Sequence, residues 1–248
     1  MFRTKIANPA ISYLRTKIAN PTISYLRTKN DNRVISYINL RRLIGIVGIS
    51  LPLVCFLGGK LFSSLPLQRS ISFYYHTNIG DFFVGLLVVV SLFLMTYKGY
   101  EVIDDFLTTI TGFFGLMIVT FPCLLAKGDK TPIGFFQLNP VISDTLHQIC
   151  SVFFFGLLAV NSFFLFTLTD KKKEMSNNKG KRNRVYKACG ILMWITLIAL
   201  IIIVRKVDEQ IVEEKRIVFY LETIMVVSFA VSWIVKGEWI WGDPKLKK

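Results

Sequence analysis

Long apolar stretches separated by short polar segments dominate the pattern of this 248-residue chain. A helix needs about 20 apolar residues to cross the roughly 30 Å hydrocarbon core of a bilayer, because each residue advances it by about 1.5 Å. Backbone groups in lipid must find their partners within the same segment, so stretches of this length predict helices. The pattern therefore predicts an all-α membrane protein with six transmembrane helices, at about Leu43–Phe62, Asp81–Tyr97, Phe106–Ala126, Ser143–Thr169, Ala188–Val204 and Ile217–Val235.

The distribution of basic residues predicts how these helices are oriented. The chain carries a net charge of +14, from 30 Lys and Arg and 16 Asp and Glu. If the N-terminus is cytoplasmic, 22 of the basic residues lie on the cytoplasmic side, whereas the acidic residues divide equally between the two sides. The whole net charge then lies on one face, so the positive-inside rule predicts that both termini are cytoplasmic. Topology accounts for the basic character, and we therefore expect no nucleic-acid binding.

The first 38 residues contain a 12-residue unit in three copies. The copies read RTKIANPAISYL (3–14), RTKIANPTISYL (15–26) and RTKNDNRVISYI (27–38). Units this short bury no core of their own, and a proline interrupts each of the first two. We expect a loosely ordered cytoplasmic tail, with a partner-docking arm as the alternative. The predicted organisation is a tail over 1–38, a transmembrane domain over 39–242 and a short basic cytoplasmic end over 243–248.

The loop predicted between the fourth and fifth helices is strongly basic, with eight Lys and Arg within residues 171–187. A basic segment beside a membrane can bind anionic lipid headgroups, each charge contributing about 1 kcal/mol. An ordinary cytoplasmic loop is the alternative interpretation. At the end of the last predicted helix, Trp233, Trp239 and Trp241, with Lys236 beside them, are typical of an interfacial anchor.

Ionisable residues gather at the predicted outer ends of the helices. His76 precedes the second helix, and Asp81 opens that helix. Asp144 opens the fourth helix, and His147 lies one turn further along it. Glu222 lies in the sixth helix. Ionisable groups within a membrane are costly, so they are functional candidates by default. Two imidazoles and a carboxylate could bind zinc and leave one position open for water. The candidate catalytic residues are therefore His76, Asp81, His147 and Glu222, and the candidate zinc ligands are His76, His147 and Glu222.

Each candidate also has a structural interpretation. Asp81 and Asp144 can bind the free N–H groups of a helix N-terminus. His76 fits an aromatic interfacial belt, and His147 can form a hydrogen bond across helices. Glu222 needs a partner, because an unpaired buried carboxylate is costly. The candidates for that partner are Arg216, Arg69 and His147.

Four strings resemble a family of uncharacterised bacterial inner-membrane proteins. They are SISFYYHT (70–77), DFFVGLLVVVSLFLMTYKGYE (81–101), KRNRVYKACG (181–190) and LETIMVVSFAVSWIVKGE (221–238). The resemblance covers roughly residues 38–242. It implies a six-helix protein of the bacterial inner membrane, with a domain of unknown function and no assigned activity.

The spacing Ser72-x3-His76 is also similar to an element of the intramembrane metal-dependent hydrolase superfamily, which includes alkaline ceramidases and progestin/adiponectin-type receptors. That likeness implies that His76 is a zinc ligand and that Ser72 orients the bound water or metal. The superfamily has seven helices and a late His-x3-His element. This chain has six predicted helices and two histidines, so Glu222 would have to take the late position.

The sequence thus favours a polytopic membrane protein that binds, senses or scaffolds. A zinc-dependent lipid hydrolase with its site at the extracytoplasmic face is one alternative, and a transporter of small solutes or lipids is another. The hydrolase requires His76, His147 and Glu222 to converge, and the transporter requires a polar cavity that reaches the middle of the membrane. The lipid bilayer is the expected partner. The residues do not indicate a substrate, an oligomeric state or whether a reaction is catalysed.

Overall fold

The structure of the chain is a computed structural model, and it describes residues 37–99, 102–168 and 176–242. The predicted tail at 1–36, part of the basic loop at 169–175 and the basic end at 243–248 lie outside the described residues. Helices account for 76% of the described residues and none of those residues forms a strand, which confirms the predicted all-α class. In order they are α3 (Tyr37–Leu53), η1 (Val54–Gly58), α4 (Gly59–Ser63), η2 (Ser72–His76), α5 (Gly80–Thr96), α6 (Val102–Thr120), α7 (Pro140–Val160), η3 (Asn161–Leu165), α8 (Asn177–Lys206), α9 (Glu209–Glu214) and α10 (Ile217–Lys236).

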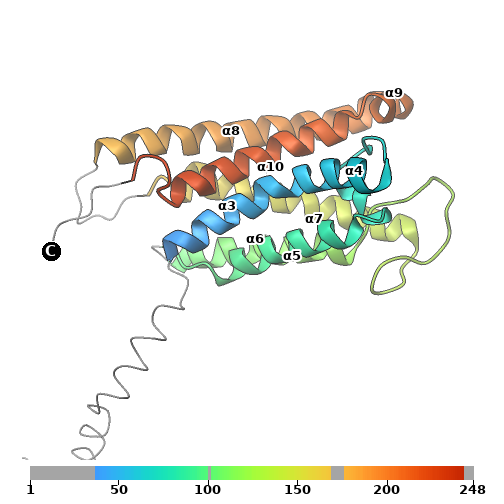
Figure 1. The fold of residues 1–248 in the computed structure, drawn as a ribbon, viewed down its shortest axis with the longest axis horizontal. Helices are drawn as coiled ribbons and strands as arrows, with labels where there is room; N and C mark the ends of the chain where they lie inside the picture. The colour runs from blue at the N-terminus through green and yellow to red at the C-terminus, as the bar shows by residue number, and fades with distance from the viewer. Residues whose placement is uncertain (1–36, 100–101, 169–175, 243–248) are drawn as a thin grey trace, which may run out of the picture. The chain divides into compact units, whose positions relative to one another are not determined.

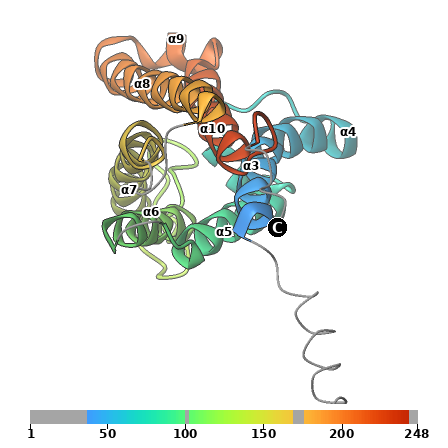
Figure 2. The ribbon, with the colours of Figure 1, turned by 90° about the vertical axis from the view of Figure 1, so that its left-hand side faces the viewer.

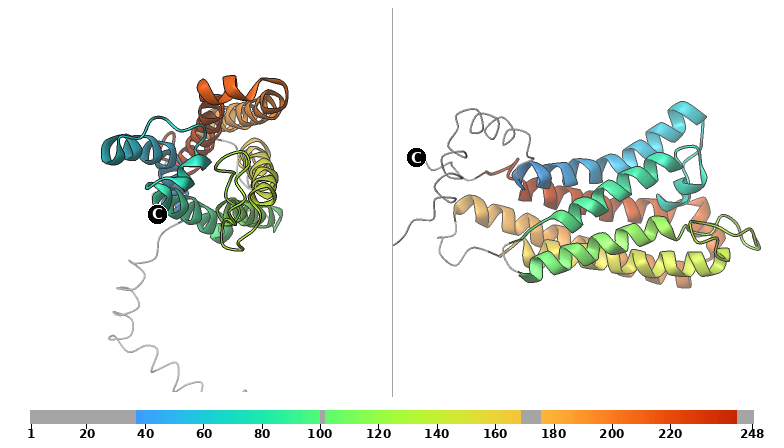
Figure 3. Two further views of the ribbon diagram at one scale, coloured as in Figure 1. Left: turned by 90° about the vertical axis from the view of Figure 1, so that its right-hand side faces the viewer. Right: turned by 90° about the horizontal axis from the view of Figure 1, so that it is seen from below.

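The long helices of residues 37–242 form a ring in which each helix packs mainly against two neighbours. Figure 2 shows the order around this ring as α3, α5, α6, α7, α8 and α10, with α10 closing it against α3. The contact between α3 and α10 is the most extensive, whereas those between α3 and α5 and between α7 and α8 are the least. We call one end of the ring the α9 end, because α9, α4 and the 121–139 loop all lie there (Figures 1 and 3).

Five helical segments of the described chain are long and apolar enough to cross a membrane. They are Ile38–Ser63, Val102–Thr120, Pro140–Leu165, Asn177–Lys206 and Ile217–Lys236. The first joins α3, η1 and α4, and the third joins α7 and η3. The remaining predicted span, Asp81–Tyr97, corresponds to α5, which is apolar but only 17 residues long. The structure therefore fits a multi-pass membrane protein.

The third predicted helix ends earlier than the sequence pattern indicates. The apolar stretch continues to Ala126, but α6 ends at Thr120. Pro122 has no N–H to donate, and its ring disfavours a helical conformation for the residue before it. The residues after Thr120 therefore leave the helix while they are still in an apolar segment.

The fourth helix begins earlier than predicted. The side chain of Asn139 accepts a hydrogen bond from the N–H of Val141 at 3.0 Å and caps α7, which then starts at Pro140. Asn139 has the side chain that an N-cap requires, and proline is well suited to the first helical position. The prediction that Asp144 opens this helix is therefore wrong.

The described part of the predicted basic loop belongs to α8. The side chain of Ser176 accepts the N–H of Lys179 at 3.0 Å and caps this helix. Arg182 is 4% exposed and donates a hydrogen bond to the carbonyl of Trp241 at 2.5 Å. Lys179 donates to the carbonyl of Phe166 at 2.8 Å. The prediction of a loop throughout 170–187 is wrong, because Lys and Arg are good helix formers once a cap starts the helix.

The predicted interfacial anchor is only partly correct. Trp233 is 1% exposed and packs edge-on against the ring of Phe166, with the centroids 5.0 Å apart. Lys236 is 5% exposed, and its Nζ lies 4.9 Å from the centroid of the same Phe166 ring. Both residues belong to the interior, whereas Trp239 and Trp241 are exposed as an anchor requires. The pattern of aromatic and basic residues did not distinguish a cation–π contact inside the bundle from a belt at its surface.

Two glycines allow α6 to approach α5 closely. A Cβ atom at Gly112 would lie 2.4 Å from the carbonyl oxygen of Ser91, and one at Gly115 would lie 2.3 Å from the Ser91 hydroxyl. Membrane helices associate through van der Waals contact between small residues, since lipid offers no hydrophobic drive between them. The close contact of α5 with α6 therefore depends on these two positions.

We expect Gly112→Ala to destabilise the protein by about 1–3 kcal/mol, because the added methyl group would overlap backbone and force α5 and α6 apart. Gly85→Ala is the matched control, since Gly85 lies in α5 and a Cβ atom there has no neighbour within 4 Å. Thermal unfolding in detergent measures both variants. Equal stability of the two variants would contradict the assigned α5–α6 contact.

Candidate functional site

A pocket of about 820 Å³ opens between α7 and α8 at the α9 end of the ring. Its wall is apolar and consists of Val152, Phe153 and Phe155 of α7 and Leu197, Leu200, Ile201 and Val204 of α8. Several of these side chains are also exposed, among them Phe153 at 50% and Val204 at 52%. The pocket therefore opens sideways through the α7–α8 wall, where the contact between neighbouring helices is among the least extensive.

The polar end of the pocket forms around residues 121–125, where the chain leaves α6. The last carbonyls of a helix have no partner within the helix, so they must find other donors. His147 of α7 donates from Nδ1 to the carbonyl of Phe121 at 2.8 Å. Ser143, one turn earlier, donates from its hydroxyl to the carbonyl of Pro122 at 2.8 Å.

Two residues before α5 supply donors for the rest of this segment. His76 donates from Nε2 to the carbonyl of Cys123 at 2.7 Å. Arg69 donates from Nη2 to the carbonyls of Leu124 and, at 3.2 Å, Leu125. Five consecutive carbonyls, from 121 to 125, therefore accept hydrogen bonds from side chains. This pattern explains why two histidines, a serine and an arginine lie together at one end of the ring.

These bonds fix the tautomers of both histidines, because a carbonyl oxygen can only accept. A neutral His147 carries its proton on Nδ1 and keeps a lone pair on Nε2. A neutral His76 carries its proton on Nε2 and keeps a lone pair on Nδ1. His147 lines the pocket and is 6% exposed, whereas His76 does not line it.

Asp144 connects α7 to the same segment. One of its carboxylate oxygens accepts the N–H of Leu124 at 2.9 Å, and the other accepts the side-chain N–H of Gln148 at 2.6 Å. Asp144 and Gln148 both line the pocket. Each oxygen of this carboxylate already has a donor.

Glu222 reaches the pocket from α10. Its Oε2 accepts the N–H of Ile71 at 2.5 Å. The described residues contain two ion pairs, and neither includes Glu222. The pairing with a basic residue that the sequence suggested is therefore not formed among the described residues, and a backbone N–H takes the place of the cation.

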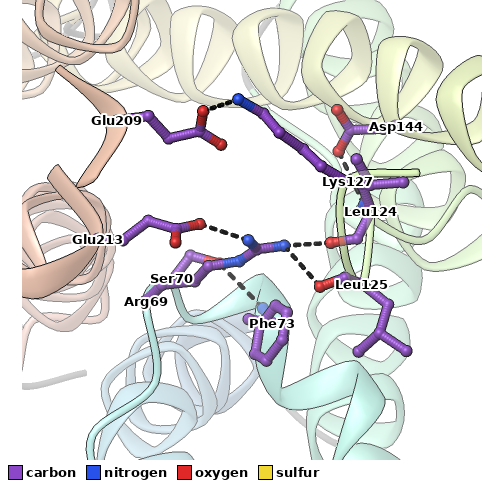
Figure 4. Close-up of polar contacts among 9 residues, drawn as sticks. All are labelled: Arg69, Ser70, Phe73, Leu124, Leu125, Lys127, Asp144, Glu209 and Glu213. Carbon is purple, nitrogen blue, oxygen red and sulfur yellow. Dashed lines mark hydrogen bonds and ion pairs between the residues drawn. The ribbon is translucent and has the colours of Figure 1, made fainter. Parts of the chain in front are cut away.

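Two ion pairs connect α9 to residues that line the polar end of the pocket (Figure 4). Arg69 bonds Glu213 of α9 at 2.5 Å, and its guanidinium lies 4.3 Å from the centroid of the Phe73 ring. Lys127 pairs with Glu209 of α9, and this bond raises the pKa of Lys127 above its usual value. The Lys127 side chain is 77% exposed, so this second pair contributes little to stability. Together the bridges join α9 to the loop that follows α6.

The structure separates the four predicted site residues. His147 and Glu222 line the same pocket, while His76 contacts the opposite side of the 121–125 segment through Cys123. Asp81 lies in the first turn of α5, is exposed and does not line the pocket. Within the described residues, no group of three or more His, Cys, Asp or Glu side chains is arranged to hold a metal ion. The zinc site stays a prediction.

Sequence reasoning missed Ser143 and considered Arg69 only as a partner of Glu222, not as a donor to backbone carbonyls. Both act on backbone carbonyls, and a backbone partner leaves no mark in the spacing of side chains. Pro122 was the available signal, because a proline near the end of an apolar helix predicts freed carbonyls that need donors. Ser72, which the hydrolase likeness singled out, does line the pocket.

No protein-family model, no curated protein and no solved structure matches this chain. Its class therefore follows from the fold and the pocket alone. The described residues form a helical bundle of the multi-pass membrane class, with one amphipathic pocket that opens through its side.

The His76 contact predicts a pH dependence of stability. Burial lowers the pKa of His76, although the bond to the Cys123 carbonyl acts in the opposite direction. Because the folded pKa is lowered, the stabilising contribution is complete above the ordinary value of about 6.5 and is lost as the pH falls through the folded pKa.

We expect the thermal unfolding midpoint in detergent to fall on acidification by about 2–4 °C more in the wild type than in His76→Gln. The glutamine amide can still donate to Cys123, but it does not titrate. His147 is present in both proteins, so its own titration cancels in the comparison. Equal shifts in the two proteins would assign the acid sensitivity to another group.

Proposed function

We propose that this protein binds a membrane-embedded amphiphile in the pocket between α7 and α8. The observation that carries this proposal is the shape of the pocket, which has an apolar wall open to the side and a polar end at the α9 end. Ligand sites typically measure about 300–1,000 Å³ and combine an apolar lining with a few convergent polar groups. At about 820 Å³ the pocket has the size and the division of polarity that an amphiphile requires.

The direction of entry supports a ligand from the bilayer rather than from water. The wall side chains that are exposed between α7 and α8 would face acyl chains, because these two helices belong to the set that is long enough to span a membrane. At the α9 end, the two ion pairs lie between the polar end and the aqueous phase. A ligand whose chain lies between α7 and α8 would place its head beside His147 and Glu222.

The proposed topology has six spans, with both termini cytoplasmic and the α9 end outside. The excess of basic residues on the predicted cytoplasmic side supports this orientation. The short α5 would complete its span with the residues that flank it. The family resemblance supports placement in the bacterial inner membrane. The α9 end would then be extracytoplasmic, so the pocket would lie in the outer leaflet.

Binding is favoured over the two other functions. Transport requires a polar path to the middle of the membrane, but the buried Asn161 lines a void with no room for a water molecule. Zinc-dependent hydrolysis requires a converging ligand set, and His76 does not share the pocket with His147 and Glu222. No specific observation on the described residues favours either function.

We expect Leu200→Trp to reduce the amount of lipid that copurifies with the protein at least severalfold, because the indole would fill the apolar part of the pocket. Ile198→Trp is the matched control, since Ile198 lies on the same helix, is 57% exposed and does not line the pocket. Native mass spectrometry of detergent-purified protein counts bound lipids per chain. Identical lipid content in the two variants would contradict the proposal.

Engineered single cysteines test the topology in a background without the four native thiols. A membrane-impermeant maleimide should label Lys130→Cys in intact spheroplasts, because Lys130 is exposed in the 121–139 loop. Asn177→Cys, exposed at the start of α8, should react only after permeabilisation. The reverse labelling pattern would show the opposite orientation, with the pocket in the inner leaflet.

A further inference from the structure

The charges around the pocket indicate the chemistry of the ligand head, and this inference rests on the proposed binding function. Four carboxylates and three basic side chains line the pocket. Two of the three basic groups already have anionic partners, since Arg69 bonds Glu213 and Lys127 bonds Glu209. Arg69 is further occupied by two backbone carbonyls. The third, Arg205, is exposed in the last turn of α8 at the rim.

The carboxylate of Glu222 differs from the other three. Glu209 and Glu213 are neutralised by their ion pairs, and both oxygens of Asp144 have donors. Glu222 has no ion pair among the described residues, and its donors are the backbone N–H groups of Ile71, at 2.5 Å, and of Ser72. A carboxylate in a site of low dielectric constant is costly unless a cation or several donors accompany it. Among the described residues no cation accompanies the Glu222 carboxylate, so a cationic group on a ligand would be its counter-ion.

His147 adds a second acceptor to the same pocket. Its Nδ1–H is committed to the Phe121 carbonyl, so the neutral ring has only the lone pair of Nε2 available. That nitrogen has no hydrogen-bond partner within the described part of the chain. The side chain is 6% exposed, and it faces the pocket that it lines.

We propose that the pocket binds an amphiphile with a protonated primary amine in its head, which donates hydrogen bonds to Glu222 and to Nε2 of His147. An ammonium group carries the missing charge and has three N–H donors, so it can satisfy both acceptors at once. An anionic head would meet the Glu222 carboxylate and find two of the three basic side chains already paired, with only Arg205 at the rim outside these ion pairs. A neutral hydroxyl could bond one acceptor but would leave the Glu222 charge without a counter-ion.

Three ligands with the same saturated chain test the proposal, namely hexadecylamine, hexadecanol and palmitate. Full-length protein in phosphatidylcholine nanodiscs is titrated with each radiolabelled ligand, and binding to empty nanodiscs is subtracted because cationic amines partition strongly into bilayers. We expect hexadecylamine to bind about tenfold or more tightly than hexadecanol, and palmitate to bind most weakly.

Glu222→Gln should remove the preference for hexadecylamine over hexadecanol, because the amide carries no charge while its oxygen can still accept the Ile71 N–H. Asp81→Asn is the charge-matched control and should behave as the wild type, because Asp81 is exposed and outside the pocket. The ranking of the three ligands is measured on the wild type, so it tests the proposal even if Glu222→Gln does not fold.

The outcomes separate the two proposals. Equal affinity for the three ligands, or a preference for palmitate, overturns the proposal that the ligand head is an amine. The proposal of amphiphile binding in the pocket is retained in that case if Leu200→Trp abolishes the binding. An amine preference that survives in a folded Glu222→Gln protein overturns the role of Glu222 as counter-ion. Absence of saturable binding by any ligand overturns the pocket function and, with it, this inference.

Discussion

The structure of the bundle at the α9 end depends on five consecutive backbone carbonyls, which need hydrogen-bond donors in an apolar segment of the chain. Pro122 breaks α6 before the apolar stretch is complete, so residues 121–125 lose their helical partners. Each unpaired carbonyl in such surroundings would cost several kcal/mol. Donors from α7, from η2 and from the segment before η2 therefore converge on this one stretch of backbone. This convergence ties the chain before α5 to the α6–α7 pair.

The same hydrogen bonds create the polar end of the pocket. A side chain that bonds a carbonyl with one atom presents its remaining atoms elsewhere, and for His147 the remaining nitrogen faces the pocket. Arg69 likewise donates to two carbonyls and forms an ion pair with Glu213. Its guanidinium also lies over the ring of Phe73. Structural and ligand-facing roles are therefore combined in single residues. Replacing one of them will affect stability and binding together, which is why ligand comparisons on the wild type are more informative than single variants.

At the opposite end of the ring, basic side chains are buried inside the bundle. There the charged side chains of Lys236 and Arg182 are buried beside aromatic rings and backbone carbonyls. Their positions in the sequence are typical of a membrane interface, because Lys236 follows the last apolar stretch and Arg182 precedes the one before it. The tertiary contacts with Phe166 and Trp241 place them inside instead. Sequence patterns placed these residues at the ends of helices but did not predict the direction in which their side chains point.

The sequence alone determined the helical class and the approximate position of each long helix, because the length and polarity of a segment are local properties that lipid makes decisive. It also placed His147 and Glu222 at the same end of the bundle. Only the tertiary structure decided that His76 turns to a carbonyl of the 121–125 segment, that Glu222 meets a backbone N–H and that α7 and α8 leave a pocket between them. These features depend on which helices are neighbours in the ring and on backbone groups freed by Pro122, and neither is encoded in the spacing of side chains.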